Sequence, residues 1–299
     1  MVKTSFCLLA AVAVALAGCS SNPSDSGGSE GPDPSGIIVF VSDRDGDYEI
    51  YSVEIDSRIV SQLTDNDVRD RYPSISSDGT KIAFTRGSGG PVDDAWTMNI
   101  GAGGETQITD TPNNDESVPV WNSDDSELVF ASDRDGNWEL YTMDPDGANP
   151  LRLTNMNGYE SDPSWSPTDD RIVFESETAG PQDILVMNAD GTGVVNITND
   201  LHDNGDPDWS PVAERIVFNS DRDGDNEIYL INPDGSGLTQ LTFNAHDEQD
   251  PQWSPDGEFI AFGSDRDGDY EIYIMRADGT DVTQLTDDPG EDWWAAWGE

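Results

Sequence analysis

The sequence has very few cysteines, histidines and lysines, and it lacks a long hydrophobic run. Its cysteines are Cys7 and Cys19, and its histidines are His202 and His246. Two cysteines allow at most one disulfide, and two histidines alone cannot form a histidine-rich metal or catalytic site. The longest apolar run, residues 7–18, is too short for a transmembrane helix, which needs about 20 residues. We therefore expect stability to come from packing rather than from disulfides.

The short apolar run has the form of a signal peptide. Lys3 supplies the positive start, and residues 7–18 supply the apolar segment. The run ends in Leu16-Ala17-Gly18-Cys19, which resembles a bacterial or archaeal lipoprotein box. This resemblance implies cleavage after residue 18, a lipid on the Cys19 sulfur, and an extracytoplasmic protein held at the cell envelope. The alternative is an ordinary signal peptide followed by a chance cysteine.

Basic residues are also scarce, with 14 Lys and Arg against 61 Asp and Glu. The formal net charge of −47 repels nucleic acid and anionic lipid headgroups, so neither is a predicted partner. Like charges oppose compaction, and salt relieves this because the Debye length falls from about 10 Å at 0.1 M to about 3 Å at 1 M. The acidic bias therefore indicates a halophilic source, although an Asp-rich repeat explains part of it.

Residues 20–35 are small, polar and interrupted by proline, with no apolar side chain able to join a core. This composition is typical of a disordered tether. We therefore divide the chain into a signal peptide (1–18), a lipid-attachment cysteine with a disordered tether (19–35), and a folded region (36–299) expected to be a monomer.

From Gly36 onward the sequence repeats with a period of about 44 residues. Each unit reads as four short strands, rich in β-branched and aromatic residues and separated by Asp-Gly turns. Six such units predict an all-β, six-bladed β-propeller with four-stranded blades. Two series of large apolar residues mark the period: Phe40, Phe84, Phe130, Phe174, Phe218 and Phe262, and then Ile75, Trp121, Trp165, Trp209, Trp253 and Trp297. We expect the tryptophans of the second series to fill the wedges between blades.

The two ends of the repeat region complement each other. The region begins with a second-type strand at Gly36 and ends with a first-type strand, residues 293–297. Pairing these ends would complete one blade and remove the open edges of a linear array. We therefore predict that the C-terminal strand pairs with the N-terminal strands and closes the ring.

The units resemble the repeats of TolB-like (WD40-like) β-propellers, whose pattern is P-x-W-S-P-D-G, S-D-R-D-G-x-x-E-I-Y, M-N-x-D-G and Q-L-T. Corresponding segments here are residues 251–257 (PQWSPDG), 220–229 (SDRDGDNEIY), 187–191 (MNADG) and 284–286 (QLT). The resemblance covers residues 36–299. It implies a propeller without the N-terminal α/β domain of TolB, because we expect no such domain to fit within residues 19–35.

The S-D-R-D-G loop occurs in four units and has two interpretations. Asp43, Asp45 and Asp47 alternate along the first of these loops, and such carboxylates are suited to Ca²⁺, the one possible cofactor. An EF-hand loop, however, has its glycine at the sixth position, whereas here Gly46 is at the fourth position counted from Asp43. The favoured interpretation is structural: the glycine makes a turn and the arginine pairs with a carboxylate of a neighbouring strand or blade.

We also predict a ring of acidic residues at one mouth of the central channel. Carboxylates converging there would attract a cation, such as Ca²⁺, or a basic peptide segment. Trp293 and Trp294 lie outside the tryptophan series, and one of them is a candidate for stacking a ligand at the mouth. The predicted ring lies three residues before the proline position of each inner strand and consists of Asp70, Glu116, Glu160, Asn204, Glu248 and Asp292.

Together these features favour binding over catalysis. The predicted function is a lipid-anchored extracytoplasmic scaffold that binds a protein, peptide or glycan of the cell envelope at the channel mouth. One alternative is a calcium-dependent hydrolase or lactonase, because some six-bladed propellers place a metal in the channel. The scarcity of histidine ligands argues against it. A purely structural envelope protein is the other alternative.

Overall fold

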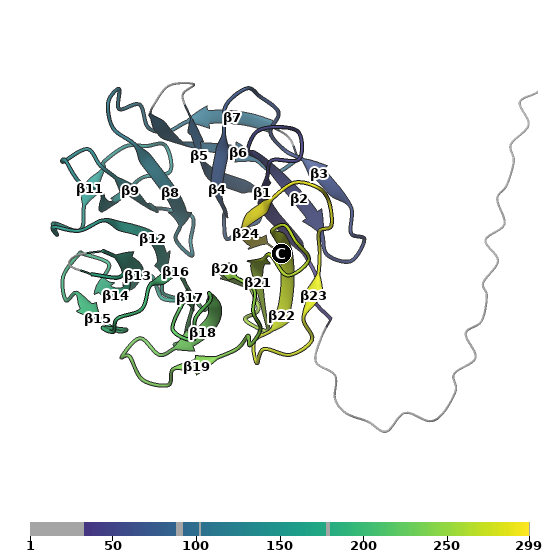
Figure 1. Ribbon diagram of the computed structural model, residues 1–299. Helices are drawn as coiled ribbons and strands as arrows, with labels where there is room; N and C mark the ends of the chain where they lie inside the picture. The colour runs from purple at the N-terminus through teal and green to yellow at the C-terminus, as the bar shows by residue number, and fades with distance from the viewer. Residues whose placement is uncertain (1–32, 88–91, 102, 178–179, 299) are drawn as a thin grey trace, which may run out of the picture. The chain divides into compact units, whose positions relative to one another are not determined.

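The computed structural model describes residues 33–87, 92–101, 103–177 and 180–298. The predicted signal peptide, Cys19 and most of the predicted tether lie outside these residues. From Pro34 onward the chain forms one compact unit. Every regular element of the described part is a β-strand, and the strands form six four-stranded antiparallel sheets around a central axis (Figure 1). The predicted all-β, six-bladed propeller is confirmed. No helix in the described ranges is long and apolar enough to span a bilayer.

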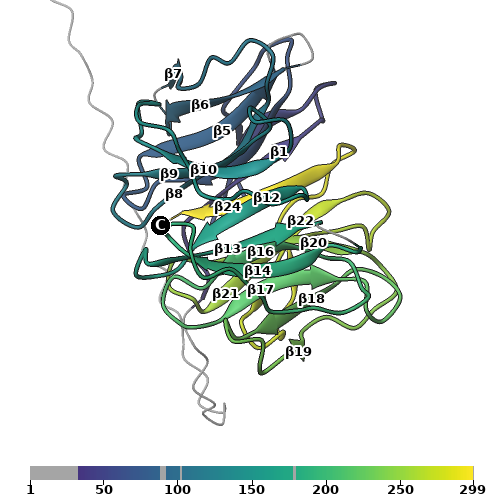
Figure 2. The same ribbon diagram turned by 90° about the vertical axis from the view of Figure 1, so that its left-hand side faces the viewer.

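Each blade runs outward from the axis through four strands, and the outermost strands lie at the periphery of the ring in Figure 1. The innermost strands are β4 (Asp70–Ile75), β8 (Glu116–Trp121), β12 (Glu160–Trp165), β16 (Asn204–Trp209), β20 (Glu248–Trp253) and β24 (Asp292–Gly298). The second strands are β1 (Ile37–Ser42), β5 (Lys81–Gly87), β9 (Leu128–Ser132), β13 (Arg171–Ser176), β17 (Ile216–Ser220) and β21 (Phe259–Ser264). The third are β2 (Glu49–Glu54), β6 (Asp93–Asn99), β10 (Glu139–Met143), β14 (Asp183–Asn188), β18 (Glu227–Ile231) and β22 (Glu271–Arg276). The outermost are β3 (Val60–Gln62), β7 (Gly103–Gln107), β11 (Leu151–Arg152), β15 (Val195–Asn196), β19 (Thr239–Gln240) and β23 (Thr283–Gln284). Figure 2 shows the ring from its side, with β7 at the top and β19 at the bottom.

The ring closes as the ends of the sequence predict. β24 pairs antiparallel with β1, placing Ile38 opposite Trp297 and giving the sheet order β24-β1-β2-β3. The Trp297 indole N–H also donates a hydrogen bond to the Ser35 carbonyl at 3.1 Å. The first blade therefore takes its innermost strand from the far end of the chain.

The core lies between the blades. The six phenylalanines of the repeat series are fully buried, and the five tryptophans of the second series are buried as well. Six hydrophobic clusters fill the six wedges between neighbouring blades. The interpretation of the tryptophan series as core residues is confirmed, and burial of each large ring contributes several kcal/mol at about 25 cal/mol per Å².

Each innermost strand is interrupted by an irregularity in its pairing with the second strand. At this point one residue per blade has a positive φ, a conformation that costs a non-glycine residue about 1–3 kcal/mol. The same backbone conformation recurs in all six blades although the side chains differ. The bulge is therefore determined by the blade architecture and not by the residue type at this position. These residues are Tyr72 (51°), Val118 (50°), Asp162 (47°), Asp206 (51°), Asp250 (51°) and Trp294 (46°).

Candidate binding site in the central channel

The six positions predicted to form an acidic ring are the first residues of the six innermost strands. Their side chains are fully buried, and none of them lines the channel cavities described below. Their role in binding stays a prediction, because the contacts that the structure gives them join strands to one another. The six are Asp70, Glu116, Glu160, Asn204, Glu248 and Asp292.

The arginine of the S-D-R-D-G loop holds this first residue in place. In the sixth blade Arg266 donates to Glu248 at 2.9 Å, and Ser264 donates to the same carboxylate at 2.8 Å. The Arg266 guanidinium also lies over the Phe262 and Tyr273 rings. The structural interpretation of the loop arginine is thus confirmed. Equivalent contacts join Arg44 to Asp292, Arg134 to Glu116 and Arg222 to Asn204, and Arg86 takes this place beside Asp70.

The fourth blade departs from this pattern, because it lacks the S-D-R-D-G loop. Glu160 accepts a hydrogen bond from Ser176 at 2.9 Å, but its Oε2 atom has no hydrogen-bond partner among the described residues. Burial, without a paired arginine, raises the pKa of Glu160 to about 7. The missing arginine leaves this blade with a carboxyl group that favours its neutral form.

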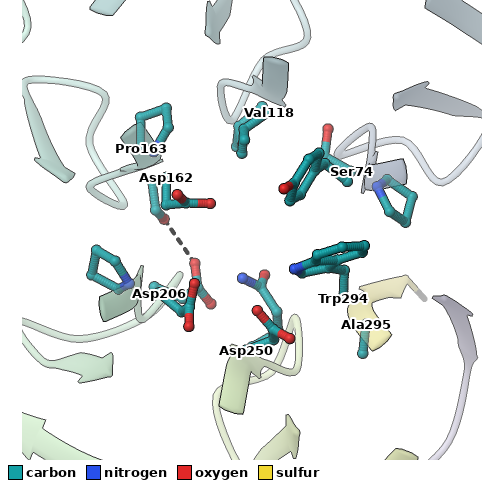
Figure 3. A pocket seen from close by; sticks show the side chains of 15 residues that line it. Ser74, Val118, Asp162, Pro163, Asp206, Asp250, Trp294 and Ala295 are labelled. Atoms are coloured by element: carbon teal, nitrogen blue, oxygen red, sulfur yellow. Dashed lines mark hydrogen bonds between the residues drawn. The ribbon is translucent and has the colours of Figure 1, made fainter. Parts of the chain in front are cut away.

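The side chains that line the channel lie two residues further along each innermost strand, at the positive-φ positions. Figure 3 shows Asp162, Asp206 and Asp250 directing their carboxyl groups into the opening, with Val118 and Trp294 on its other sides. Tyr72 completes this set of six channel-lining residues. The channel is therefore acidic on one side and apolar or aromatic on the other.

We call Asp162, Asp206, Asp250 and Glu175 the acidic wall; Glu175 comes from β13 and lines the same mouth. One oxygen each of Asp162, Glu175 and Asp206 lies within 4.8 Å of the others, close enough together to share a cation. Burial and then the Asp162 charge raise the pKa of Asp206 to about 7. Burial, together with the charges of Asp162 and Asp206, likewise raises the pKa of Glu175 and Asp250 above the usual range.

The opposite side, which we call the aromatic wall, consists of Tyr72, Trp293, Trp294 and Tyr270. The Tyr72 and Trp294 rings lie 4.4 Å apart, and Tyr270 stacks on Trp293 at 4.1 Å. The two indoles are 6.0 Å apart, so the four rings form one continuous surface. Trp294 lines the channel, as the sequence suggested for one of these two tryptophans.

A further carboxyl group lies deeper in the channel. Ser164 donates to Asp208 Oδ1 at 2.7 Å, and the Trp253 backbone N–H donates to Oδ2 at 2.8 Å. Burial raises the pKa of Asp208 to about 6. Because both of its oxygens already accept hydrogen bonds, Asp208 is less available to a ligand than the acidic wall.

The structure gives Asp43 and Asp45 hydrogen bonds within the fold. Asp43 Oδ1 accepts from the Glu291 backbone N–H at 2.9 Å, and Asp45 accepts from Gln62 at 2.5 Å. Asp43, Asp45 and Asp47 are not among the described groups whose oxygens lie within 4.8 Å of one another, and Ca²⁺ binding there stays a prediction. The closely spaced loop groups are Asp223, Asp225 and Glu227, and Asp267, Asp269 and Glu271.

Comparison with known proteins supports the architecture. The family model of the TolB beta propeller domain (PD40) matches residues 91–205 and 152–264, which together span more than half of the chain. A TolB homolog of Chlorobaculum tepidum is 34% identical over 124 residues, which cover 40% of this chain and only 27% of that protein.

Among solved structures, TolB from Acinetobacter baumannii superimposes with a TM-score of 0.75 at 20% identity, covering 88% of this chain and 66% of that one. An oligogalacturonate lyase in complex with manganese gives a TM-score of 0.59 at 19% identity, covering 83% and 73%. At these identities the two structures show a shared fold alone. Since the family model accounts for most of the repeats, the chain belongs to the TolB beta propeller domain family.

Proposed function

We propose that this chain is an extracytoplasmic binding protein, anchored through a lipid on Cys19, that holds a protein, peptide or glycan at the mouth of its channel. The location and the lipid are inferred from residues 1–19, whose pattern resembles that of lipoproteins. The relation to TolB homologs is consistent with such a location.

The observation that carries the proposal is the channel mouth, where the acidic wall faces the aromatic wall. Recognition sites combine apolar and aromatic surface with a few convergent polar groups, and this mouth has both. Its cavity volume is about 390 Å³, enough for a side chain, a short peptide segment or a sugar ring.

The loops that lead into two of the channel-lining strands carry exposed apolar side chains. Leu201 is 87% exposed and Phe243 is 74% exposed. They lie in the loops that lead into β16 and β20, the strands that carry Asp206 and Asp250. Exposed apolar side chains on such loops are a common feature of protein-binding surfaces.

Catalysis receives less support from the residues of the channel. The described side chains that line it include carboxylates, aromatics, Gln and Ser, but no histidine, cysteine or lysine. His202 and His246 instead lie on the rim loops, each 3.4 Å from an Asp carboxylate of the neighbouring loop. Catalysis in the channel would require a metal ion held by the acidic wall. Metal binding is therefore tested below, alongside the binding of organic cations.

Photo-crosslinking in the producing cell tests the binding function. A diazirine amino acid at Leu201 or Phe243 should give discrete adducts, because these exposed side chains lie on the loops that lead into strands of the proposed site. Matched controls are Leu151 and Val195, which are 60% and 55% exposed but lie on outermost strands. Trp294→Leu should abolish the adducts made at Leu201. Equal labelling from rim and outer positions would contradict the proposal.

A further inference from the structure

We infer that the acidic wall binds an organic cation, the ammonium or guanidinium group of an amine or of a basic side chain, whose apolar part rests on the aromatic wall. This inference rests on the proposed binding function and narrows it to one ligand chemistry. Three features of the mouth carry it: carboxyl groups without a counterion, an oxygen-lined gap and the facing rings.

The first feature is negative charge without a counterion. Among the described residues, no lysine or arginine forms a salt bridge with Asp162, Glu175, Asp206 or Asp250. The buried carboxylates at the starts of the strands, by contrast, are mostly paired with arginine. Buried carboxyl groups that lie this close together need a proton or a positive ligand.

The second feature is an oxygen-lined gap above Gly205. A Cβ atom placed on Gly205 would lie 3.1 Å from Glu175 Oε2, 3.5 Å from Asn219 Oδ1 and 3.9 Å from Gln182 Oε1. Asn219 lies opposite Gly205 in the sheet and is only 7% exposed, yet its Oδ1 atom accepts no hydrogen bond from any described residue. A buried carbonyl oxygen without a donor is unfavourable, and a ligand N–H group would satisfy it.

The third feature is the aromatic wall across the opening. A cation over an exposed ring gains about 0.5–1 kcal/mol, and more when it is desolvated. The Tyr72 ring already accepts such a contact, since the Arg71 guanidinium lies 5.3 Å from its centroid while pairing with Asp93. Trp294 and Val118 offer apolar contact for the rest of the ligand.

The facing rings also favour an organic cation over a bare metal ion. The oxygens of Asp162, Glu175 and Asp206 lie within 4.8 Å of one another and are close enough to hold either kind of cation. A metal ion, however, would leave the aromatic wall without a role.

The test is calorimetric titration of the full-length protein in detergent. Probes are spermidine, methylguanidinium, the peptide acetyl-Gly-Arg-Gly and its neutral citrulline analogue, with CaCl₂ and MnCl₂ titrated separately. Because the chain carries a net charge of −47, titrations need about 1 M NaCl, where the Debye length is about 3 Å and non-specific attraction is suppressed. We expect saturable one-to-one binding of the cationic probes and none of the citrulline peptide.

Variants locate the site. Asp206→Asn should weaken binding about tenfold or more by removing one charged acceptor. Gly205→Ala should weaken it similarly without changing any charge, because the new methyl group occupies the gap. The matched controls should bind like the parent: Gly263→Ala, where a Cβ meets nothing closer than 3.6 Å, and Asp56→Asn, an exposed loop residue.

The outcomes separate the alternatives. Tighter binding of the arginine peptide than of methylguanidinium and spermidine would assign the cation to a protein partner, and the reverse would assign it to a free amine. Binding of Ca²⁺ or Mn²⁺ that Asp206→Asn abolishes, with no binding of the organic cations, would overturn the inference in favour of a metal site. If Asp206→Asn and Asp56→Asn lose the same affinity for the cationic probes, the binding is non-specific attraction to the acidic surface and the inference is overturned. If no probe binds while Leu201 still crosslinks, the binding function stands without this ligand class.

Discussion

Replacing Asp206 with asparagine should make the propeller more stable, although it removes a residue of the proposed site. Asp206 is half-buried and lies close to the carboxyl groups of Asp162 and Glu175, and its pKa is about 7, against an ordinary value of 3.8. Each pKa unit corresponds to 1.36 kcal/mol, so ionising Asp206 in the folded chain costs about 4 kcal/mol. Asparagine keeps the shape, carries no charge and tolerates the left-handed backbone at φ 51°.

The sign of the effect depends on pH. Below about pH 4 the group is protonated in both the folded and the unfolded chain, and Asp206 costs nothing. As the pH rises from 4 through 7 the unfolded chain releases this proton and the folded chain retains it, so the parent loses stability. The advantage of Asp206→Asn should therefore be greatest near pH 8 and vanish near pH 4.

Thermal unfolding followed by circular dichroism at pH 8, 6 and 4.5 measures this effect. For a domain of this size 1 kcal/mol corresponds to about 2 °C, so we expect the melting temperature to rise by about 4–8 °C at pH 8. Asp56→Asn removes one exposed charge elsewhere and controls for net charge. A melting temperature at pH 8 equal to or below that of the parent would refute the reasoning, as would a gain that does not change with pH.

Four further predictions concern the rest of the molecule. Trp297→Ala should cost about 3–5 kcal/mol in urea unfolding, and deletion of residues 292–299 should abolish cooperative melting; a truncated protein that melts like the parent would exclude closure by β24. Glu248→Ala should cost about 3–5 kcal/mol because it leaves Arg266 partly buried without its carboxylate, and a change below about 1 kcal/mol would contradict this structural role. The melting temperature should rise between about 0.1 and 2 M NaCl as salt screens the acidic surface, and a flat profile would argue against salt adaptation. Cys19→Ser should move the protein from the membrane to the soluble fraction, whereas unchanged fractionation would exclude the lipid anchor.

Most of this fold can be predicted from the sequence, because the repeat period and the complementary strands at the two ends are both visible in it. The phenylalanine and tryptophan series mark the blades, and the complementary ends predict the pairing of β24 with β1. The channel residues are harder to predict because of the bulge in each innermost strand. In a regular strand, residues two apart share a face, so Asp70 and Tyr72 would point the same way.

The left-handed residue breaks this alternation. Asp70 remains buried against Arg86, while Tyr72 lines the channel. The residue types do not predict the bulge, because Tyr, Val and Trp rarely adopt a positive φ. The available signal is positional: the residue before the proline position is Asp in three consecutive units, at Asp162, Asp206 and Asp250.

The strand that closes the ring also carries part of the proposed site. Trp297 of β24 anchors the first blade, while Trp293 and Trp294 of the same strand form half of the aromatic wall. A ligand that rests on Trp294 would therefore contact the strand that closes the ring. At a free ligand concentration of a hundred times its Kd, binding would add about 2.7 kcal/mol to the stability of the closed ring. Bound ligand should then make it harder to detach β24 from β1, and a force applied to the C-terminal end should release the ligand. If the proposed ligand binds there, mechanical tension and ligand release would be linked through one strand.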